Sequence, residues 1–178
     1  LNNFGPLPAF GNFGGVAGVY KPPAISATIT GVFTNAAPTS PYRGAGRPEA
    51  TLAIEQVIDL AGREMGIDRI ELRRRNIIPP DAFPYQTALT YNYDSGEFER
   101  NMDRALEMAD AASFEARRAK SKANGKLRGL GIANAIEQAA GMFDEGGEIR
   151  FDQEGHITVL MGTHAHGQGH ETVFKQLL

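Results

Sequence analysis

A glycine-framed turn in the last part of the chain combines groups that could bind a polar ligand. In GTHAHGQGHET (residues 162–172), Gly167 and Gly169 flank Gln168, after an expected strand and before an expected helix. Glycine permits tight turns, and free amide groups at a helix start favour an anion such as a phosphate. The side-chain amide of Gln168 offers both a donor and an acceptor. The pattern predicts either a ligand-binding turn or an ordinary connection between a strand and a helix.

The same turn contains three histidines, which indicate a second possible chemistry. His164, His166 and His170 lie within seven residues of one another. Three neutral imidazoles are a sufficient set of protein ligands for an open catalytic zinc site. One hypothesis is therefore a zinc hydrolase, and the other interpretation is that these are polar loop residues.

A second candidate segment is PYRGAGRPEA (residues 41–50), in which Arg43 and Arg47 flank Gly44-Ala45-Gly46 ahead of an expected helix. Small side chains leave room for a ligand against the backbone, and arginine binds anions and carbonyl groups. The alternative is that Arg47 caps a turn at the helix start. Glu137, at the end of an expected strand, could face a site or could simply be a polar strand end.

These two segments resemble the large, molybdenum-cofactor-binding subunit of the xanthine dehydrogenase/aldehyde oxidase family. PYRGAGRPEA is similar to the active-site loop of that family, and GTHAHGQGHETVFKQ is similar to its pterin-binding loop. Other similar stretches follow in family order, among them ELRRRNIIPP and KLRGLGIANAIEQ, so the resemblance runs from about residue 25 to residue 178. Within the family, the aerobic carbon monoxide dehydrogenase large-chain branch is the most similar.

The resemblance implies a role for each candidate residue. The molybdenum is held by the pterin dithiolene, so no side chain of this chain is expected to ligate a metal. The implied catalytic residues are Arg43 and Gly44, next to the metal, and Gln168, beside the molybdenum ligands. The implied cofactor-binding residues, which line the pterin and its phosphates, are Gly167, Gln168, Gly169 and His170.

The resemblance also implies an activity and its partners. The chain would be part of the catalytic large subunit of a molybdenum hydroxylase, an oxidoreductase that oxidises an aldehyde or an N-heteroaromatic compound with water as the oxygen source. The implied cofactor is molybdopterin, in its cytosine dinucleotide form. FAD-binding and 2Fe–2S iron–sulfur subunits would be the partners, and the expected location is cytoplasmic. The general base of the family lies near the C-terminus of the large subunit, outside this chain.

Two departures from the family pattern argue against two substrates, carbon monoxide and a purine. Carbon monoxide dehydrogenases have a copper-ligating cysteine in this loop, but here Gly44 takes that place and the chain has no cysteine. The alternative is a protein that is named a carbon monoxide dehydrogenase large chain but lacks this cysteine. Without the cysteine, the loop cannot ligate copper, and oxidation of carbon monoxide is not expected. Xanthine-type loops have an aromatic residue near Ala45, which a methyl group cannot replace as a contact for a purine ring.

Composition excludes several other classes of protein. The 178 residues have a formal net charge of -3, which argues against a general nucleic-acid binder. No apolar run approaches the roughly 20 residues of a membrane span. Charge is nevertheless uneven, because residues 113–128 are basic and residues 129–178 are acidic. A non-catalytic interaction module that docks a partner through these surfaces is a third hypothesis.

The order of elements predicts an α+β fold, a partial molybdopterin-binding domain over residues 1–178 with a mixed sheet and packed amphipathic helices. Residues 1–24 are expected to be an irregular lead-in. Residues 25–125 are expected to hold a strand (25–34), the active-site loop and several helices, the first from near Pro48 to Gly66 with Glu55 and Asp59 on a solvated face. Two capping pairs, Asp68 with Glu71 and Asp94 with Glu97, are expected to open two further helices. Residues 126–178 are expected to hold a strand (127–137), a hairpin (147–161) and the pterin-binding loop. Because the chain lacks an initial Met and stops within an expected helix, we expect a piece of a longer polypeptide.

Overall fold

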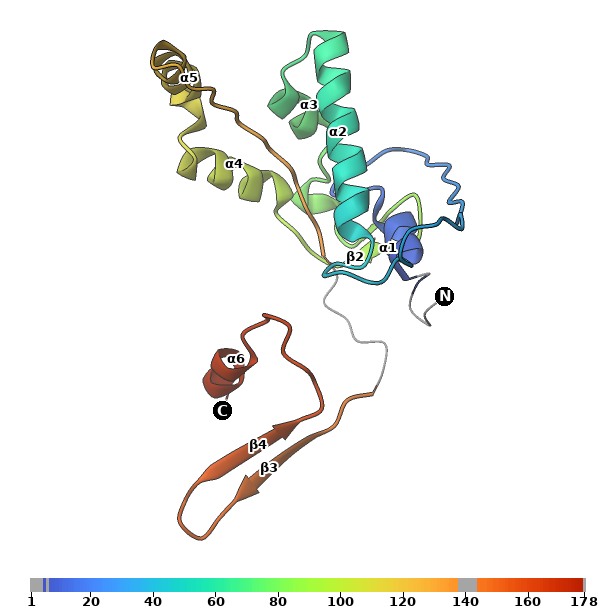
Figure 1. Cartoon of the computed structure of the whole chain (residues 1–178), viewed down its shortest axis with the longest axis vertical. Helices are drawn as coiled ribbons and strands as arrows, with labels where there is room; N and C mark the ends of the chain where they lie inside the picture. The colour runs from blue at the N-terminus through green and yellow to red at the C-terminus, as the bar shows by residue number, and fades with distance from the viewer. Residues whose placement is uncertain (1–4, 6, 138–143, 178) are drawn as a thin grey trace. The chain divides into compact units, whose positions relative to one another are not determined.

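The computed structural model describes residues 5, 7–137 and 144–177. Figure 1 shows the chain, which divides into two compact units, residues 1–137 and residues 138–178. Each unit is described by itself. The first unit contains α1 (Leu7–Gly15), α2 (Arg47–Met65), α3 (Arg69–Asn76), η1 (Pro80–Ala82), β1 (Tyr85–Gln86), β2 (Asn92–Tyr93), α4 (Phe98–Met108), η2 (Ala111–Ser113) and α5 (Phe114–Ala123). The second contains β3 (Gly147–Phe151), β4 (Ile157–Met161) and α6 (His170–Leu177).

The long helix α2 begins and ends where its sequence indicates. Pro48 lies in its first turn, where a fixed φ and a missing N–H cost nothing. Gly66 adopts a φ of 66° just beyond the helix, and its N–H donates to the Gly62 carbonyl. This left-handed cap is the ordinary use of a glycine at a helix end. The predicted helix from Pro48 to Gly66 is confirmed.

The two predicted capping pairs have different outcomes. Asp68 caps α3, because its Oδ1 accepts hydrogen bonds from the Ile70 and Glu71 amides at 2.9 and 3.0 Å. The expected Asp94–Glu97 pair is wrong in detail, since the cap residue of α4 is Glu97 and no side chain bonds the helix start. The helix α4 forms nevertheless, because its apolar stripe packs on the core.

The core of the first unit joins residues that are far apart in the sequence. Val19, Tyr20, Ile77 and Met102 are buried together. The backbone around Tyr20 forms an isolated antiparallel bridge with Ile77, so the segment after α1 lies against the end of α3. Partly buried apolar residues surround this centre; they are Ile54, Ile58, Ile70, Phe98, Leu106, Ile132 and Ile136.

Three parts of the sequence-based expectation need correction. Residues 25–34 form no strand; Phe33 is 86% exposed, because no neighbouring strand covers this stretch among the described residues. Residues 127–137 are extended but belong to no ladder. The lead-in is not wholly irregular, since α1 occupies Leu7–Gly15. The α+β class is confirmed, and the sheets in the described part of the chain are two antiparallel pairs, β1–β2 and β3–β4.

The second unit is built on the predicted hairpin. Strands β3 and β4 pair antiparallel from Gly147↔Met161 to Phe151↔Ile157. Asp152 organises the turn, because its Oδ1 accepts from the Glu154 and His156 amides, both at 2.9 Å. Apolar side chains on the strands, including Phe151 and Ile157, are exposed within this unit. None of the helices described here has the length and apolar character that crossing a membrane requires.

Candidate functional site

The loop that precedes α2 has an unusual backbone. Gly44, Ala45 and Gly46 follow one another with φ values of 93°, 45° and 100°. The turn is closed by two hydrogen bonds, from the Ala45 amide to the Tyr42 carbonyl at 2.6 Å and from the Arg47 amide to the Gly44 carbonyl at 3.1 Å. A left-handed conformation costs a non-glycine residue roughly 1–2 kcal/mol, and such strain concentrates at functional sites.

Arg47 fixes this loop. Its Nη1 donates to the Gly44 carbonyl at 3.2 Å and lies 3.1 Å from Glu137 Oε1. The guanidinium carbon lies 6.0 Å from the centre of the Tyr91 ring, at the outer limit of a cation–π contact. Arg47 thus bonds a carbonyl group of the turn before α2, which is the contact expected of an arginine that caps this turn. The side chain of Arg43, in contrast, is exposed.

Helix α1 supports the loop through a face of glycines that sequence reasoning did not identify. A Cβ added at Gly11 would lie 2.0 Å from the Ala45 carbonyl oxygen, and one at Gly14 would lie 2.6 Å from the Tyr91 ring. A Cβ added at Gly15 would lie 3.5 Å from the Ala50 Cβ, an ordinary van der Waals contact. The signal was present in the sequence, because Gly11, Gly14 and Gly15 have the i, i+3, i+4 spacing of one helical face.

A side chain at Gly44 would require its neighbours to shift. A Cβ there would lie 2.6 Å from Pro48 Cδ and 3.2 Å from Glu137 Oε2. Gly44 and Ala45 are nevertheless only partly buried. A ligand could therefore approach the peptide groups of this loop directly, which is the arrangement that a small-residue loop allows.

The glycine-framed turn of the second unit has a similar backbone character. Gly167 and Gly169 have φ values of 104° and 75°, and α6 starts directly afterwards at His170. The Gly169 carbonyl accepts hydrogen bonds from the Thr172 and Val173 amides, both at 3.0 Å. Gln168 is exposed, and its side-chain oxygen accepts a hydrogen bond from the His166 amide. The turn thus presents backbone groups and one side-chain amide to the outside.

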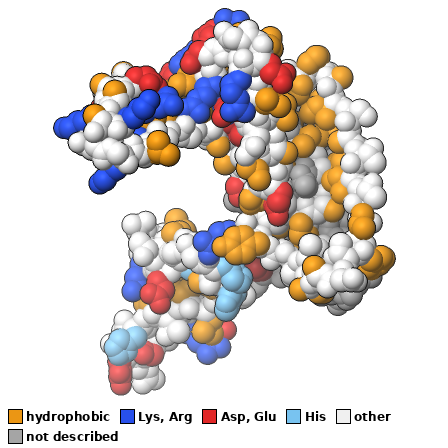
Figure 2. Space-filling view, turned by 45° about the horizontal axis from the view of Figure 1, so that its top comes forward, with side chains coloured by type: hydrophobic (Ala, Val, Ile, Leu, Met, Phe, Trp, Pro, Cys, Tyr) orange, Lys and Arg blue, Asp and Glu red, His pale blue; other side chains and the backbone are white. Residues whose placement is uncertain are grey.

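The three histidines of this turn do not form a ligand set. The rings of His164 and His166 lie 4.6 Å apart, whereas His170 packs on Phe174 at 5.1 Å. Histidine side chains reach the surface of the second unit (Figure 2). Over the described parts of the chain, metal-ligating atoms converge at one place, the hairpin turn with Asp152, Glu154 and His156. The zinc hypothesis on the loop histidines therefore lacks the geometry that it requires.

A buried ionic cluster joins α2 and α3. Arg73 and Glu55 have side chains that are 0% and 5% exposed, so the expectation that Glu55 lies on a solvated face is wrong. Asp59 is partly buried and pairs with Arg73 Nη1 at 2.7 Å. Burial lowers the pKa of Arg73, but the hydrogen bonds to Asp59 and Glu55 outweigh it and raise the pKa above its usual value. The cluster holds α2 against α3.

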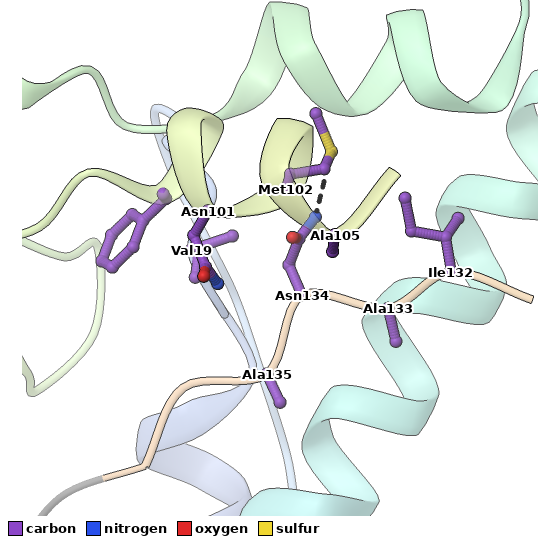
Figure 3. Close-up of a pocket in the computed structure, with 9 residues that line it drawn as sticks. Val19, Asn101, Met102, Ala105, Ile132, Ala133, Asn134 and Ala135 are labelled. Carbon is purple, nitrogen blue, oxygen red and sulfur yellow. Dashed lines mark hydrogen bonds between the residues drawn. The ribbon is translucent and has the colours of Figure 1, made fainter. Parts of the chain in front are cut away.

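The cavity beside α4 is too small for a substrate. It has a volume of about 90 Å³ and is lined by α4 and the extended segment at residues 132–135 (Figure 3). Ligand pockets usually measure roughly 300–1,000 Å³. Each unit therefore has its own candidate site, the loop at residues 43–47 in the unit of residues 1–137 and the turn at residues 167–170 in the unit of residues 138–178.

Comparison with known proteins now defines the class of the chain. Two family models, each described as a molybdopterin cofactor-binding domain, match residues 2–77 and 104–178. The first match includes the loop at Gly44 and the second includes the turn at Gln168. Both candidate segments therefore lie in regions that match a molybdopterin cofactor-binding domain.

Relatives and a solved structure agree with this class. The 6-hydroxypseudooxynicotine dehydrogenase complex subunit gamma of Paenarthrobacter nicotinovorans is 36% identical over 92% of this chain and 21% of its own length. The carbon monoxide dehydrogenase large chain of Hydrogenophaga pseudoflava is 31% identical over 91% of this chain and 22% of its own length. The crystal structure of quinoline 2-oxidoreductase from Pseudomonas putida 86 matches with a TM-score of 0.81 and 29% identity, over 99% of this chain and 24% of that one.

The chain belongs to the molybdopterin cofactor-binding domain family, which the two models together match over most of its length. It spans about a fifth of the length of the curated relatives that it matches.

Proposed function

We propose that the chain forms part of the catalytic large subunit of a molybdenum hydroxylase, as a partial molybdopterin-binding domain over residues 1–178. The observation that carries the proposal is the loop at residues 44–46, whose backbone is held in the left-handed region and kept free of bulky side chains. A rigid loop of this kind lets a large cofactor lie against peptide groups. The family membership of the chain supports the same role.

The residues present fit a pterin cofactor. When bound, molybdopterin supplies the redox chemistry that inserts water-derived oxygen into a substrate, while the protein supplies binding and orientation. Gln168 has a side-chain amide at the surface of an open glycine turn, which suits hydrogen bonding to polar cofactor groups. We assign Gly167, Gly169 and His170 to the pterin and its phosphates, at the start of α6, where backbone amides favour anions.

In the same proposal, Arg43 and Gly44 belong to the substrate side of the site. Arg43 is a fixed cation on an exposed stretch next to the loop, where it can orient an anionic or carbonyl-containing group. Gly44 keeps the loop backbone accessible. Arg43 would orient the substrate, and Gly44 would leave space for it by having no side chain. Neither residue would exchange protons with the substrate.

We propose an aldehyde or an N-heteroaromatic compound as the substrate. Two relatives have names that refer to nitrogen-containing aromatic compounds, 6-hydroxypseudooxynicotine and quinoline. The chain has no cysteine, so the loop cannot supply a thiolate to copper. This argues against carbon monoxide oxidation, although carbon monoxide dehydrogenase large chains are among the relatives.

The partners and the location follow from the same proposal. Electrons would leave through 2Fe–2S clusters and FAD on partner subunits or on other domains, because these 178 residues contain no cysteine to ligate iron. One relative is named as a subunit of a complex, which supports an assembly of several chains. We propose the cytosine dinucleotide form of the cofactor and a cytoplasmic holoprotein.

The proposal is tested by elemental analysis of the native holoprotein that contains this chain. About one molybdenum per chain without copper is the expected result, and zinc without molybdenum would contradict the proposal. Replacing Gln168 by Ala should lower the molybdenum content severalfold, because an amide that bonds a ligand contributes about 1 kcal/mol or more. Gln153→Ala, at the exposed hairpin turn, is the matched control and should retain the metal.

A further inference from the structure

The extended segment at residues 130–137 is held in place by arginine side chains rather than by a neighbouring strand. Arg69 Nη2 donates to the Leu130 carbonyl at 2.7 Å, and Arg73 Nη2 donates to the Ile132 carbonyl at 3.3 Å. These two carbonyls are two residues apart and so lie on the same edge of an extended chain. The guanidinium groups therefore take the place of a strand partner along this edge.

The register of the segment is fixed by the buried cluster. Arg73 is itself held by the Glu55 carboxylate at 2.8 Å, so it cannot move without exposing a buried charge. Asn134 points into the core, where its Nδ2 donates to the Tyr20 hydroxyl at 3.2 Å and contacts Met102 Sδ at 3.6 Å. Figure 3 shows Ile132 and Asn134 on one side of the segment and Ala133 and Ala135 on the other.

This alternation determines where Glu137 lies. Even-numbered residues from Leu130 to Ile136 are at least partly buried, and odd-numbered residues, including Glu137, are exposed. Glu137 is consequently on the outer face, where its Oε1 lies 3.1 Å from Arg47 Nη1. The same nitrogen donates to the Gly44 carbonyl at 3.2 Å. One guanidinium nitrogen thus links the end of the anchored segment to the loop.

We infer that Glu137 is a positioning residue for the loop at residues 41–47, acting through Arg47 on the Gly44 carbonyl. This inference rests on the proposed function of that loop. The Glu137 side chain is 54% exposed, so its ion pair with Arg47 adds little to global stability. Its effect is local: it selects one orientation of the Arg47 guanidinium and, with it, one position of the Gly44 peptide group.

The test uses the native holoprotein and replaces Glu137 by Ala. Hydrogen exchange at the Ala45 and Arg47 amides reports the opening of the loop, because both are hydrogen-bonded within it. We expect exchange at these amides to quicken about tenfold, with kcat lower by about tenfold and KM nearly unchanged, since small misplacements near a reacting centre are costly. Thermal unfolding and molybdenum content should stay at the wild-type level.

Two further variants separate positioning from general damage. Glu137→Gln keeps an oxygen that accepts from Arg47 Nη1, so it should restore most of the exchange protection and of kcat. Glu71→Ala removes an exposed ion pair within α3, in which Glu71 lies 2.7 Å from Arg75. This variant should change neither the exchange rates of the loop amides nor kcat. Wild-type exchange in Glu137→Ala would overturn the inference, as would fast exchange with an unchanged kcat. If the wild-type native protein contained no molybdenum, the proposed function would be contradicted but the inference about Glu137 would not. The hydrogen-exchange rates would still decide whether Glu137 positions the loop.

Discussion

Arg73 and Glu55 form an ion pair that is almost fully shielded from water, with 2.8 Å between Arg73 Nε and Glu55 Oε2. The Tyr20 hydroxyl donates to the other carboxylate oxygen of Glu55 at 2.5 Å. Three elements therefore meet at one carboxylate: the segment after α1, helix α2 and helix α3.

Removing one partner of this pair should be strongly destabilising. Replacing Arg73 by Met leaves the Glu55 charge buried without its cation, and we expect a loss of about 3–5 kcal/mol in the free energy of unfolding. Denaturant titration measures it. Arg75→Met, which removes an exposed pair on the same helix, should cost about 0.5 kcal/mol or less. Equal losses for the two variants would contradict the structural role of the buried pair.

The glycine face of α1 gives a second prediction. Gly11→Ala places a Cβ against the Ala45 carbonyl, so the helix or the loop must shift, and overpacking of this kind costs about 1–3 kcal/mol. We expect lower thermal stability and reduced molybdenum retention in the holoprotein. Gly31→Ala is the matched control, because no atom lies within 4 Å of its added Cβ. Retained molybdenum and an unshifted unfolding temperature in Gly11→Ala would show that α1 does not support the loop.

Alanine substitutions at Gly44 and Gly66 distinguish the cost of backbone strain from the cost of a steric clash. Both have positive φ values, but an added Cβ meets Pro48 at Gly44 and open space at Gly66. Gly66→Ala should therefore cost only the strain, about 1–2 kcal/mol. Gly44→Ala should cost more and should also lower kcat. Unfolding free energies and steady-state rates of the two variants test this, and an equal cost in both would rule out the contact at Pro48.

Alkaline pH should destabilise the first unit through its buried tyrosines. Burial raises the pKa of Tyr93 from 10.0 to about 12, and burial also raises the pKa of Tyr20. Between pH 10 and 12 the unfolded chain releases a proton that folded Tyr93 retains, so stability falls as the pH rises through this window. Each such tyrosine should remove about 2–3 kcal/mol by pH 12.

The tyrosine prediction is measured by unfolding at pH 9–12. Tyr93→Phe should make the alkaline loss smaller, although it also removes the hydrogen bond from the hydroxyl to the Gly18 carbonyl at 2.8 Å. Tyr42→Phe is the control, since Tyr42 is exposed and should leave the pH profile unchanged. If the profile of Tyr93→Phe matches that of the wild type, the hydroxyl does not stay protonated in the folded state.

The sequence predicted those elements whose signals are local. Pro48 and Gly66 set the ends of α2, Asp68 capped α3, and alternation around a glycine turn indicated the β3–β4 hairpin. Each of these signals acts within a few residues of the element that it defines. The two candidate loops were identified for the same reason, since each is a short contiguous motif.

The features that sequence reasoning missed depend on distant partners. Glu55 resembled a solvated helix residue because its cation, Arg73, comes 18 residues later on another helix. Residues 25–34 have a strand-like pattern, but a strand also requires a neighbour, which a pattern cannot supply. Helix α1 was obscured by its glycines, which are weak helix formers and are used here for close packing against α2 and the loop.

The loop at residues 44–46 also has an evolutionary consequence. A Cβ added at Gly44 would meet Pro48, and Gly46 is buried with a φ of 100°, so a side chain at either position requires the loop or its neighbours to shift. Ala45 is the one residue of the three that carries a side chain. Mutation can therefore vary the size of the group presented by this loop at a single codon, while the fold that supports it stays the same.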